Sequence, residues 1–365
     1  MRLASLQPQR RWLTPLAIPV LLVATTAVVR PQVIGEIERL DPPAQGFFSR
    51  QLVMHGIPIM AHADVSDAAL DAAARRLDRL LARAPRIAAN LARLGTQLHV
   101  IGKDQACSDL PEYRHLKGKP FDGNLTIDER GRGYGGLFCS CGEENLLFLE
   151  SDPYRDHRDI CSHEFAHTVL DFALSPEIRD RVEAQHRQSL AAGRWAGTYA
   201  ATNAGEFLAE LTMWYVGSRG DYGTLDPPPE PGAHWLRRYD PEAYALLDDI
   251  YGGRLEPPEV EVTDLQSLPP EQEGQIRSLD GQPATQVIFL NETGELLRLF
   301  WLDFDGKRQS YGEVPPGAQG QSTFATHAWL VETPDGRVLG IYVPDTTIGR
   351  VIIRSAPLEA KEPNP

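Results

Sequence analysis

Residues 161–172, CSHEFAHTVLDF, contain the pattern H-E-F-A-H at residues 163–167. Residues four apart on an α-helix share a face, so the imidazoles of His163 and His167 would converge on one ion. Glu164 is offset around the helix and would reach a water molecule beside that ion. The pattern has two interpretations: the catalytic helix of a zinc enzyme, or an ordinary helix with two histidines on its surface.

A catalytic zinc site of this kind needs a third ligand from elsewhere in the chain. Zinc takes nitrogen and carboxylate ligands in tetrahedral geometry, and a catalytic site leaves one position for water. The stretch TYAATNAGEFLAELTMWYVG, residues 198–217, predicts a second helix that begins near Asn203 and carries Glu206 in its first turn. Because Asn203 and Glu206 also match a capping-box pattern, a structural role for Glu206 is the alternative.

The composition is that of a globular protein with an acidic surface. Of the 365 residues, 42% are hydrophobic and 24% are charged, which argues against a wholly disordered chain. The formal net charge of −14 argues against nucleic-acid binding, because a phosphate backbone would repel that surface. The partners that we expect are therefore peptides or proteins, and nothing in the sequence specifies an oligomeric state.

The N-terminal segment predicts export. Arg2, Arg10 and Arg11 precede an uncharged run, WLTPLAIPVLLVATTAVV, residues 12–29, as a positive n-region precedes an apolar h-region. Two alternatives remain open: residues 1–30 are a cleaved signal peptide, or residues 12–29 remain as a membrane anchor near the lower length limit of a spanning helix. Either alternative places the rest of the chain in the periplasm, outside the cell or at its surface.

The chain has four cysteines, Cys107, Cys139, Cys141 and Cys161. An even number of cysteines in an exported protein predicts two disulfides. Cys139 and Cys141 are too close in sequence to pair readily with each other, so each would pair with Cys107 or Cys161. Four buried free thiols are the alternative.

Hydrophobic spacing predicts helices in the first part of the chain and short strands near its end. SDAALDAAARRLDRLLARA, residues 66–84, places its leucines on one helical face, with Ser66 or Asp67 as the N-cap. LRRYDPEAYALLDDIYGG, residues 236–253, reads as one short helix. From residue 284, TQVIFLN, ELLRLFWLDFDG, TFATHAWLV and RVLGIYV read as strands separated by turn residues.

The two helices around the histidines carry a pattern shared with a known family. HEFAH, followed by Tyr199, Thr202-Asn203 and EFLAE at residues 206–210, resembles the catalytic domain of anthrax lethal factor and its relatives, including the Pro-Pro endopeptidases. GIPIMAHADVSDAALDAA, DLPEY and EENLLFLESDPYRDHRDICSHEFAH also look like exported fungal and bacterial proteins with the same core. Together these matches cover about residues 50–253.

This resemblance implies a mainly helical zincin-type fold and a metallopeptidase with one catalytic Zn²⁺. The implied zinc ligands are His163, His167 and Glu206, and the implied general base is Glu164. Tyr199 is implied to stabilise the oxyanion, a role that suits a phenol aimed at developing negative charge.

Three further features of this region are candidates for supporting roles. Asp171, one turn beyond His167, and Glu210, one turn beyond Glu206, are candidate partners for the imidazoles of the zinc site. The glycine-rich RGRGYGG, residues 130–136, is a lid, an edge strand that pairs with the substrate backbone, or a plain loop.

The C-terminal strands resemble the β domain of the von Hippel–Lindau tumour suppressor family over about residues 284–345. That family captures a hydroxyproline-bearing peptide in an aromatic pocket. The positions that the resemblance carries over are Trp301, Tyr311, Thr323, His327 and Trp329, with Thr323 in place of a serine and Phe324 in place of a tyrosine. An unmodified proline-rich or other extended peptide suits such a pocket as well. A structural role for Trp301 and Trp329 in the sandwich core is the alternative.

We therefore expect an α+β protein, with a mainly helical zincin-type catalytic domain followed by a small all-β sandwich. The expected boundaries are 1–30 for the signal peptide or membrane anchor, 31–48 for a linker, 49–255 for the metallopeptidase domain, 256–281 for a second linker, 282–356 for the β-sandwich and 357–365 for a disordered tail. The expected function is that of an exported zinc endopeptidase whose β-sandwich recognises substrate. The rival is a non-catalytic cell-surface binding protein with a structural or vestigial zinc site.

Overall fold

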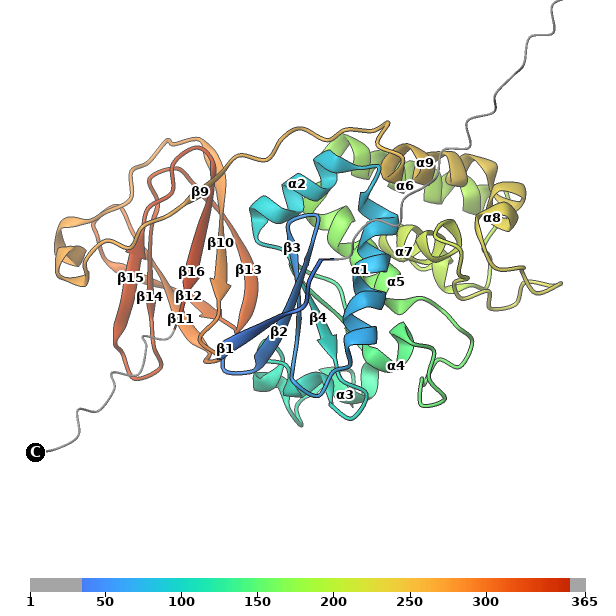
Figure 1. Cartoon of the computed structure of the whole chain (residues 1–365). Helices are drawn as coiled ribbons and strands as arrows, with labels where there is room; N and C mark the ends of the chain where they lie inside the picture. Colours follow the sequence, from blue (N-terminus) through green and yellow to red (C-terminus); the bar gives the residue numbers. More distant parts are fainter. Residues whose placement is uncertain (1–34, 355–365) are drawn as a thin grey trace, which may run out of the picture. The chain divides into compact units, whose positions relative to one another are not determined.

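The computed structural model describes residues 35–354 (Figure 1). The expected signal peptide or anchor, residues 1–30 with the apolar run 12–29, and the expected tail, residues 357–365, lie outside the described residues. Within the described range, no helix is both long enough and apolar enough to cross a bilayer. A region of mixed helices and strands is followed by a C-terminal region made almost entirely of strands, which confirms the mixed composition that the sequence predicts.

The first region is built on a six-stranded sheet with the strand order β1-β2-β3-β4-β8-β7. Its strands are β1 (Glu38–Ala44), β2 (Phe48–Met54), β3 (Ile57–Ala61), β4 (Gln97–Ile101), β7 (Gly133–Tyr134) and β8 (Phe138–Gly142). β3, β4 and β8 are parallel to one another, and β7 pairs antiparallel with β8 at the edge of the sheet. The expected linker over residues 31–48 is wrong, because β1 lies within it as the other edge strand, and its charges and prolines are typical of an edge.

Two helices follow β3, and the first is the one that the sequence predicts over residues 66–84. α1 (Asp67–Leu81) begins after Ser66, whose hydroxyl oxygen accepts a hydrogen bond from the N–H of Ala69 at 3.3 Å. Its leucines are fully buried and pack against the sheet and α5, which accounts for the predicted apolar face. α2 (Pro85–Leu94) has a proline at its first position, where the missing N–H costs nothing.

The histidine motif lies on α5 (Ile160–Thr168), which packs between β8 and α7 (Ala204–Tyr215). α7 begins after Asn203, as predicted, because the Asn203 side chain accepts a hydrogen bond from the N–H of Glu206. Figure 1 shows α6 (Pro176–Ala191) and the two last helices gathered around α7.

The segment 236–253, predicted to be one helix, forms parts of two. α8 (Ala233–Tyr239) ends before Asp240, and α9 (Pro241–Tyr251) begins immediately after it. A proline cannot donate the hydrogen bond that would continue α8, and the Asp240 carboxylate instead accepts from the N–H of Ala243 at 3.2 Å to cap α9.

Short elements connect β4 to α5 on the side where the histidines lie. They are β5 (Pro120–Asp122), β6 (Leu125–Thr126), α3 (Ile127–Arg130) and α4 (Glu143–Leu146). β5 and β6 pair as a small antiparallel hairpin, and β7 follows α3 directly.

The C-terminal region consists of two four-stranded sheets, with the orders β13-β10-β16-β9 and β12-β11-β14-β15. The strands are β9 (Val262–Asp264), β10 (Ala284–Asn291), β11 (Leu297–Leu302), β12 (Arg308–Val314), β13 (Gly317–Phe324), β14 (Ala328–Glu332), β15 (Val338–Tyr342) and β16 (Ile348–Ile353). Phe289, Leu299, Trp329 and Val351 form part of one buried cluster contributed by both sheets. The expected linker over residues 256–281 is wrong in part, because β9 pairs in parallel with β16.

Candidate metal and catalytic site

Three side chains from α5 and α7 point at one another. The Nε2 atoms of His163 and His167 are 3.3 Å apart, and Oε2 of Glu206 is 3.3 Å from the first and 3.4 Å from the second. Among the described residues, these three form a group whose ligand atoms could hold a metal ion. The structure thus brings together the two histidines and the glutamate that the sequence singled out.

The capping alternative for Glu206 is resolved by the geometry of its helix. Asn203 caps α7 by accepting from the main-chain N–H of Glu206 at 2.9 Å. The Glu206 side chain points instead to the two histidines. The main chain of Glu206 therefore takes part in the helix cap, and its side chain takes part in the cluster.

The cluster favours positive charge. Burial alone would lower the pKa of His163, but the carboxylates of Glu206 and Glu210 raise it to about 10. Burial likewise opposes ionisation of Glu206, yet hydrogen bonds from His163 and His167 hold its pKa well below the usual range. Two carboxylates around two imidazoles would stabilise a cation at this point.

Glu164 lies in the same cavity, on the side that faces the edge strand β7. Burial raises the pKa of its carboxyl, although His163 and His167 oppose the shift. The N–H of Gly135 also donates to this carboxyl. A carboxyl whose pKa is raised toward neutrality is suited to both accepting and releasing a proton.

The glycine-rich segment 130–136 forms β7 and its flanks. A Cβ at Gly133 would lie 2.9 Å from the carbonyl oxygen of Ser140 and 3.1 Å from Cγ of Glu164, and a Cβ at Gly135 would lie 2.8 Å from Cβ of His167. Only glycine allows the main chain to approach α5 this closely. Two residues of the segment, Gly133–Tyr134, form the edge strand β7, and pairing of this strand with a substrate backbone stays a prediction.

A cavity of about 670 Å³ opens in front of the cluster. Aromatic and aliphatic side chains form part of its wall, contributed by Phe121, Tyr134, Tyr154 and Ile160. Phe121 comes from the β5–β6 hairpin and is 45% exposed at the cavity side. The cavity therefore combines an apolar surface with the polar cluster, as substrate sites commonly do.

Tyr199 also lines this cavity. Its ring stacks on that of His163 with centroids 6.5 Å apart, and it is 38% exposed. Its phenol contacts Arg130 and Glu206, and burial raises its pKa, so the hydroxyl keeps its proton at neutral pH. Arg130 was not predicted from the sequence, since its place depends on the fold of the β5–α3 segment.

Of the two candidate partners for the imidazoles, Glu210 lies in contact with one of them. Oε1 of Glu210 is 3.2 Å from Nδ1 of His163. Asp171 is exposed and lies in the π-helical turn, Val169–Ala173, that directly follows α5. Burial raises the pKa of its carboxyl and the charge of His167 opposes that shift, so a role of Asp171 as a partner of the imidazole stays a prediction.

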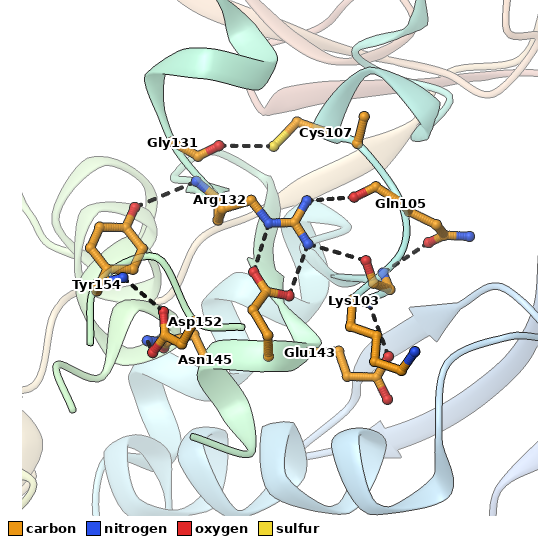
Figure 2. Close-up of polar contacts among 12 residues, drawn as sticks. Lys103, Gln105, Cys107, Gly131, Arg132, Glu143, Asn145, Asp152 and Tyr154 are labelled. Carbon is orange, nitrogen blue, oxygen red and sulfur yellow. Dashed lines mark hydrogen bonds and ion pairs between the residues drawn. The ribbon is translucent and has the colours of Figure 1, made fainter. Parts of the chain in front are cut away.

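Arg132 holds the entry of β7 in place and was not predicted either. Its guanidinium donates to both carboxylate oxygens of Glu144 at 2.6 and 2.8 Å and to the carbonyl oxygen of Gln105 at 2.6 Å (Figure 2). Its main-chain N–H donates to the hydroxyl of Tyr154 at 3.4 Å. No spacing in the sequence indicates this group, because its members come from four separate segments.

All four cysteines are free and buried, so the two expected disulfides are absent from the structure. Cys107 lies in a separate cluster with Phe48 and Ile101 and donates to the carbonyl oxygen of Gly131 at 3.1 Å. Cys139, Cys141 and Cys161 belong to the main core.

The five candidate residues of the β region divide into two groups. Trp329 is 2% exposed, and its Nε1 donates to Oγ1 of the buried Thr323 at 3.2 Å. Both side chains are thus satisfied within the sandwich. Trp301, Tyr311 and His327 lie together nearer the surface, with the Trp301 ring 5.3 Å from His327 and 6.4 Å from Tyr311.

The exposed aromatic group is larger than the sequence indicated. Phe304 is 45% exposed and meets the Trp301 ring at 5.2 Å, and Phe324 is 47% exposed and meets the His327 ring at 5.2 Å. Nε1 of Trp301 is buried without a hydrogen-bond partner among the described residues.

The comparison with known families supports the assignment of the C-terminal β region. The family model of the VHL beta domain matches residues 276–337. The C-terminal region of the chain is therefore similar to that domain, and the match begins within the segment that the sequence had assigned to a linker.

Proposed function

We propose that the chain is an exported zinc-dependent endopeptidase whose C-terminal β region holds part of the substrate. The observation that carries the proposal is the spacing of the three ligand atoms. Two ligands that each lie about 2.0–2.1 Å from a tetrahedral zinc ion are about 3.3–3.4 Å apart. The separations among His163, His167 and Glu206 are 3.3, 3.3 and 3.4 Å.

The donor set supports the same assignment. Two neutral imidazoles and one carboxylate suit zinc, so His163, His167 and Glu206 would hold the ion beside the cavity that they line. Oε2 of Glu206 and Nδ1 of His163 are buried without a well-aligned hydrogen bond, as expected of groups arranged for an ion and for ion-pair contacts. When bound, zinc supplies a Lewis acid that polarises the substrate carbonyl and lowers the pKa of the attacking water.

The other residues of the cavity have matching roles. Glu164 accepts the proton of the attacking water and donates it to the leaving amine. Its raised pKa supports both steps. Tyr199 donates its phenolic hydrogen to the carbonyl oxygen as negative charge develops there. Oε1 of Glu210 lies 3.2 Å from Nδ1 of His163, and this ion-pair contact would fix the orientation of that imidazole.

The edge strand β7 supports a peptide as the substrate. β7 lies beside Glu164 and has β8 on one side only, so its other edge can pair with an extended chain. The apolar wall at Tyr134 and Tyr154 would accept substrate side chains. An extended peptide would then run past the cluster with one peptide bond near Glu164.

A peptide-library digest tests this function. The zinc-loaded chain should cleave a subset of peptides at defined positions, and removal of the metal with a chelator should abolish cleavage. Zinc binding at one ion per chain without cleavage of any peptide or protein would contradict the peptidase.

A second candidate is a peptide-binding protein without catalysis. The observation that favours it is the exposed aromatic group of the β region, Trp301, Phe304, Tyr311 and His327, together with the similarity to the VHL beta domain. Such a surface would hold a proline- or hydroxyproline-containing peptide. Equal binding of a peptide and its proline-to-alanine variant would remove proline recognition.

A further inference from the structure

The loop that follows α7 folds back onto the site. Gly220, in this loop, packs so closely on α7 that a Cβ there would lie 2.3 Å from Oε2 of Glu210 and 2.5 Å from the Trp214 ring. Farther along, the N–H of Thr224 donates to the carbonyl oxygen of Gly197 at 3.3 Å. The loop therefore touches both α7 and the segment that leads to Tyr199.

Asp221 lies between these two contacts and makes one in each direction. Its main-chain N–H donates to Oε2 of Glu210 at 2.5 Å. Its carboxylate oxygen Oδ2 accepts from the main-chain N–H of Tyr199 at 2.9 Å. Because Oε1 of Glu210 is 3.2 Å from Nδ1 of His163, a continuous series of polar contacts joins the His163 imidazole to the Tyr199 main chain.

Tyr199 needs such a support. It begins a single 3₁₀ turn, Tyr199–Ala201, and its side chain is 38% exposed, so packing holds it less firmly than the buried histidine. The other carboxylate oxygen of Asp221 lies 3.9 Å from Nη1 of Arg158, so a cation faces the carboxylate on that side. Asp221 lines the same cavity as Tyr199.

We propose that Asp221 is a positioning residue that fixes the Tyr199 hydroxyl relative to His163. The proposal rests on the proposed peptidase function and deepens it, because Asp221 acts on the reaction only through Tyr199. A donor to a developing oxyanion must sit within about 2.7–3.1 Å of it, and a displacement of about 1 Å can cost about 100-fold in rate. A hydrogen bond to the main chain of Tyr199 controls that position directly.

A double-mutant cycle tests this role. Asp221→Ala keeps the N–H that Glu210 accepts, and it removes the hydrogen bond from Tyr199 together with the 3.9 Å ion pair with Arg158. In the wild-type background we expect kcat to fall by about 10- to 100-fold, with KM and zinc affinity unchanged. In the Tyr199→Phe background the same substitution should cost less than about 3-fold, since no phenol remains to be positioned. Asp221→Asn, which keeps an acceptor oxygen, should restore most of the rate.

Two results would overturn the proposal while leaving the peptidase intact. One is an equal loss of kcat in both backgrounds, which indicates a general structural effect, and the other is no loss in either. An inactive wild-type chain would instead refute the peptidase. Amide hydrogen exchange would still decide the contact in that case: we expect faster exchange at Tyr199 in Asp221→Ala than in Asp221→Asn, and equal rates would exclude it.

Discussion

Nδ1 of His163 lies 3.2 Å from Oε1 of Glu210, a side chain that is 2% exposed. The carboxylate thus contacts the imidazole at Nδ1, while Nε2 of the same ring faces His167 and Glu206. The buried carboxylate orients the ring and makes it more basic, and both effects strengthen a metal ligand.

Glu210→Ala should weaken zinc binding by about 10- to 100-fold, because His163 loses the group that orients it. Competition with a chromogenic chelator would measure the affinity. Asp171→Ala is the matched control, since Asp171 makes no polar contact with either histidine within the described residues, and it should bind zinc as the wild type does. Equal affinities in Glu210→Ala and the wild type would remove the supporting role of Glu210.

Arg132→Met should lower the free energy of unfolding by about 3 kcal/mol, because it leaves the buried Glu144 carboxylate without its partner. Arg130→Met removes an exposed ion pair with Asp122 and should cost less than about 1 kcal/mol. Urea unfolding of both variants measures the difference. Similar losses in the two would show that the Arg132 group does not anchor β7.

The buried thiols predict a pH dependence. Burial raises the pKa of Cys107 to about 11 and that of Cys139 well above the usual range, and a hydrogen bond with Cys161 together with burial raises that of Cys141 well above it. These groups keep their protons in the folded chain, whereas the unfolded thiols ionise near pH 8.5. Their contribution to the free energy of unfolding should therefore be constant below about pH 8.5 and should fall between about pH 8.5 and 11.

Thiol labelling at pH 8 tests directly whether the four cysteines are buried free thiols. The folded chain should react slowly with a thiol reagent, and the unfolded chain should react rapidly at all four cysteines. Fast labelling of the folded chain, or fewer than four thiols after unfolding without a reductant, would contradict four buried free cysteines.

Trp329 and Tyr311, both in the β region, should respond differently to replacement by alanine. Trp329→Ala removes a buried side chain from the sandwich core and should cost about 3–5 kcal/mol in the free energy of unfolding. Tyr311→Ala removes a side chain that is 50% exposed and should cost less than about 1 kcal/mol. Peptide binding that survives Tyr311→Ala and Trp301→Ala would show that the exposed aromatic group is not the binding surface.

The sequence predicted those parts of the site that lie on regular helices. The i, i+4 spacing of His163 and His167 places both imidazoles on one face of α5, and the cap at Asn203 places Glu206 in the first turn of α7, whereas the meeting of the three side chains depends on the packing of α7 against α5. The π-helical turn that contains Asp171 was indicated by no local pattern.

The contacts made through loops could not be predicted. Asp221 reaches Tyr199 only because Gly220 lets the loop approach α7, and Arg132 meets acceptors from segments that are distant in sequence. The strand β1 was missed because its charged residues and prolines interrupt the alternation of polar and apolar residues by which strands are recognised. In the sequence, these close approaches of the main chain were marked only by the glycines at 133 and 220.

The role of Glu164 is tested most directly by the rate of peptide cleavage by the wild type and by Glu164→Gln at equal zinc occupancy. Glu164 is not among the three proposed zinc ligands, so the variant should bind one zinc ion with unchanged affinity. We expect kcat to fall by at least about 100-fold, because the proton acceptor is lost. Cleavage by Glu164→Gln at the wild-type rate would contradict the proposed mechanism.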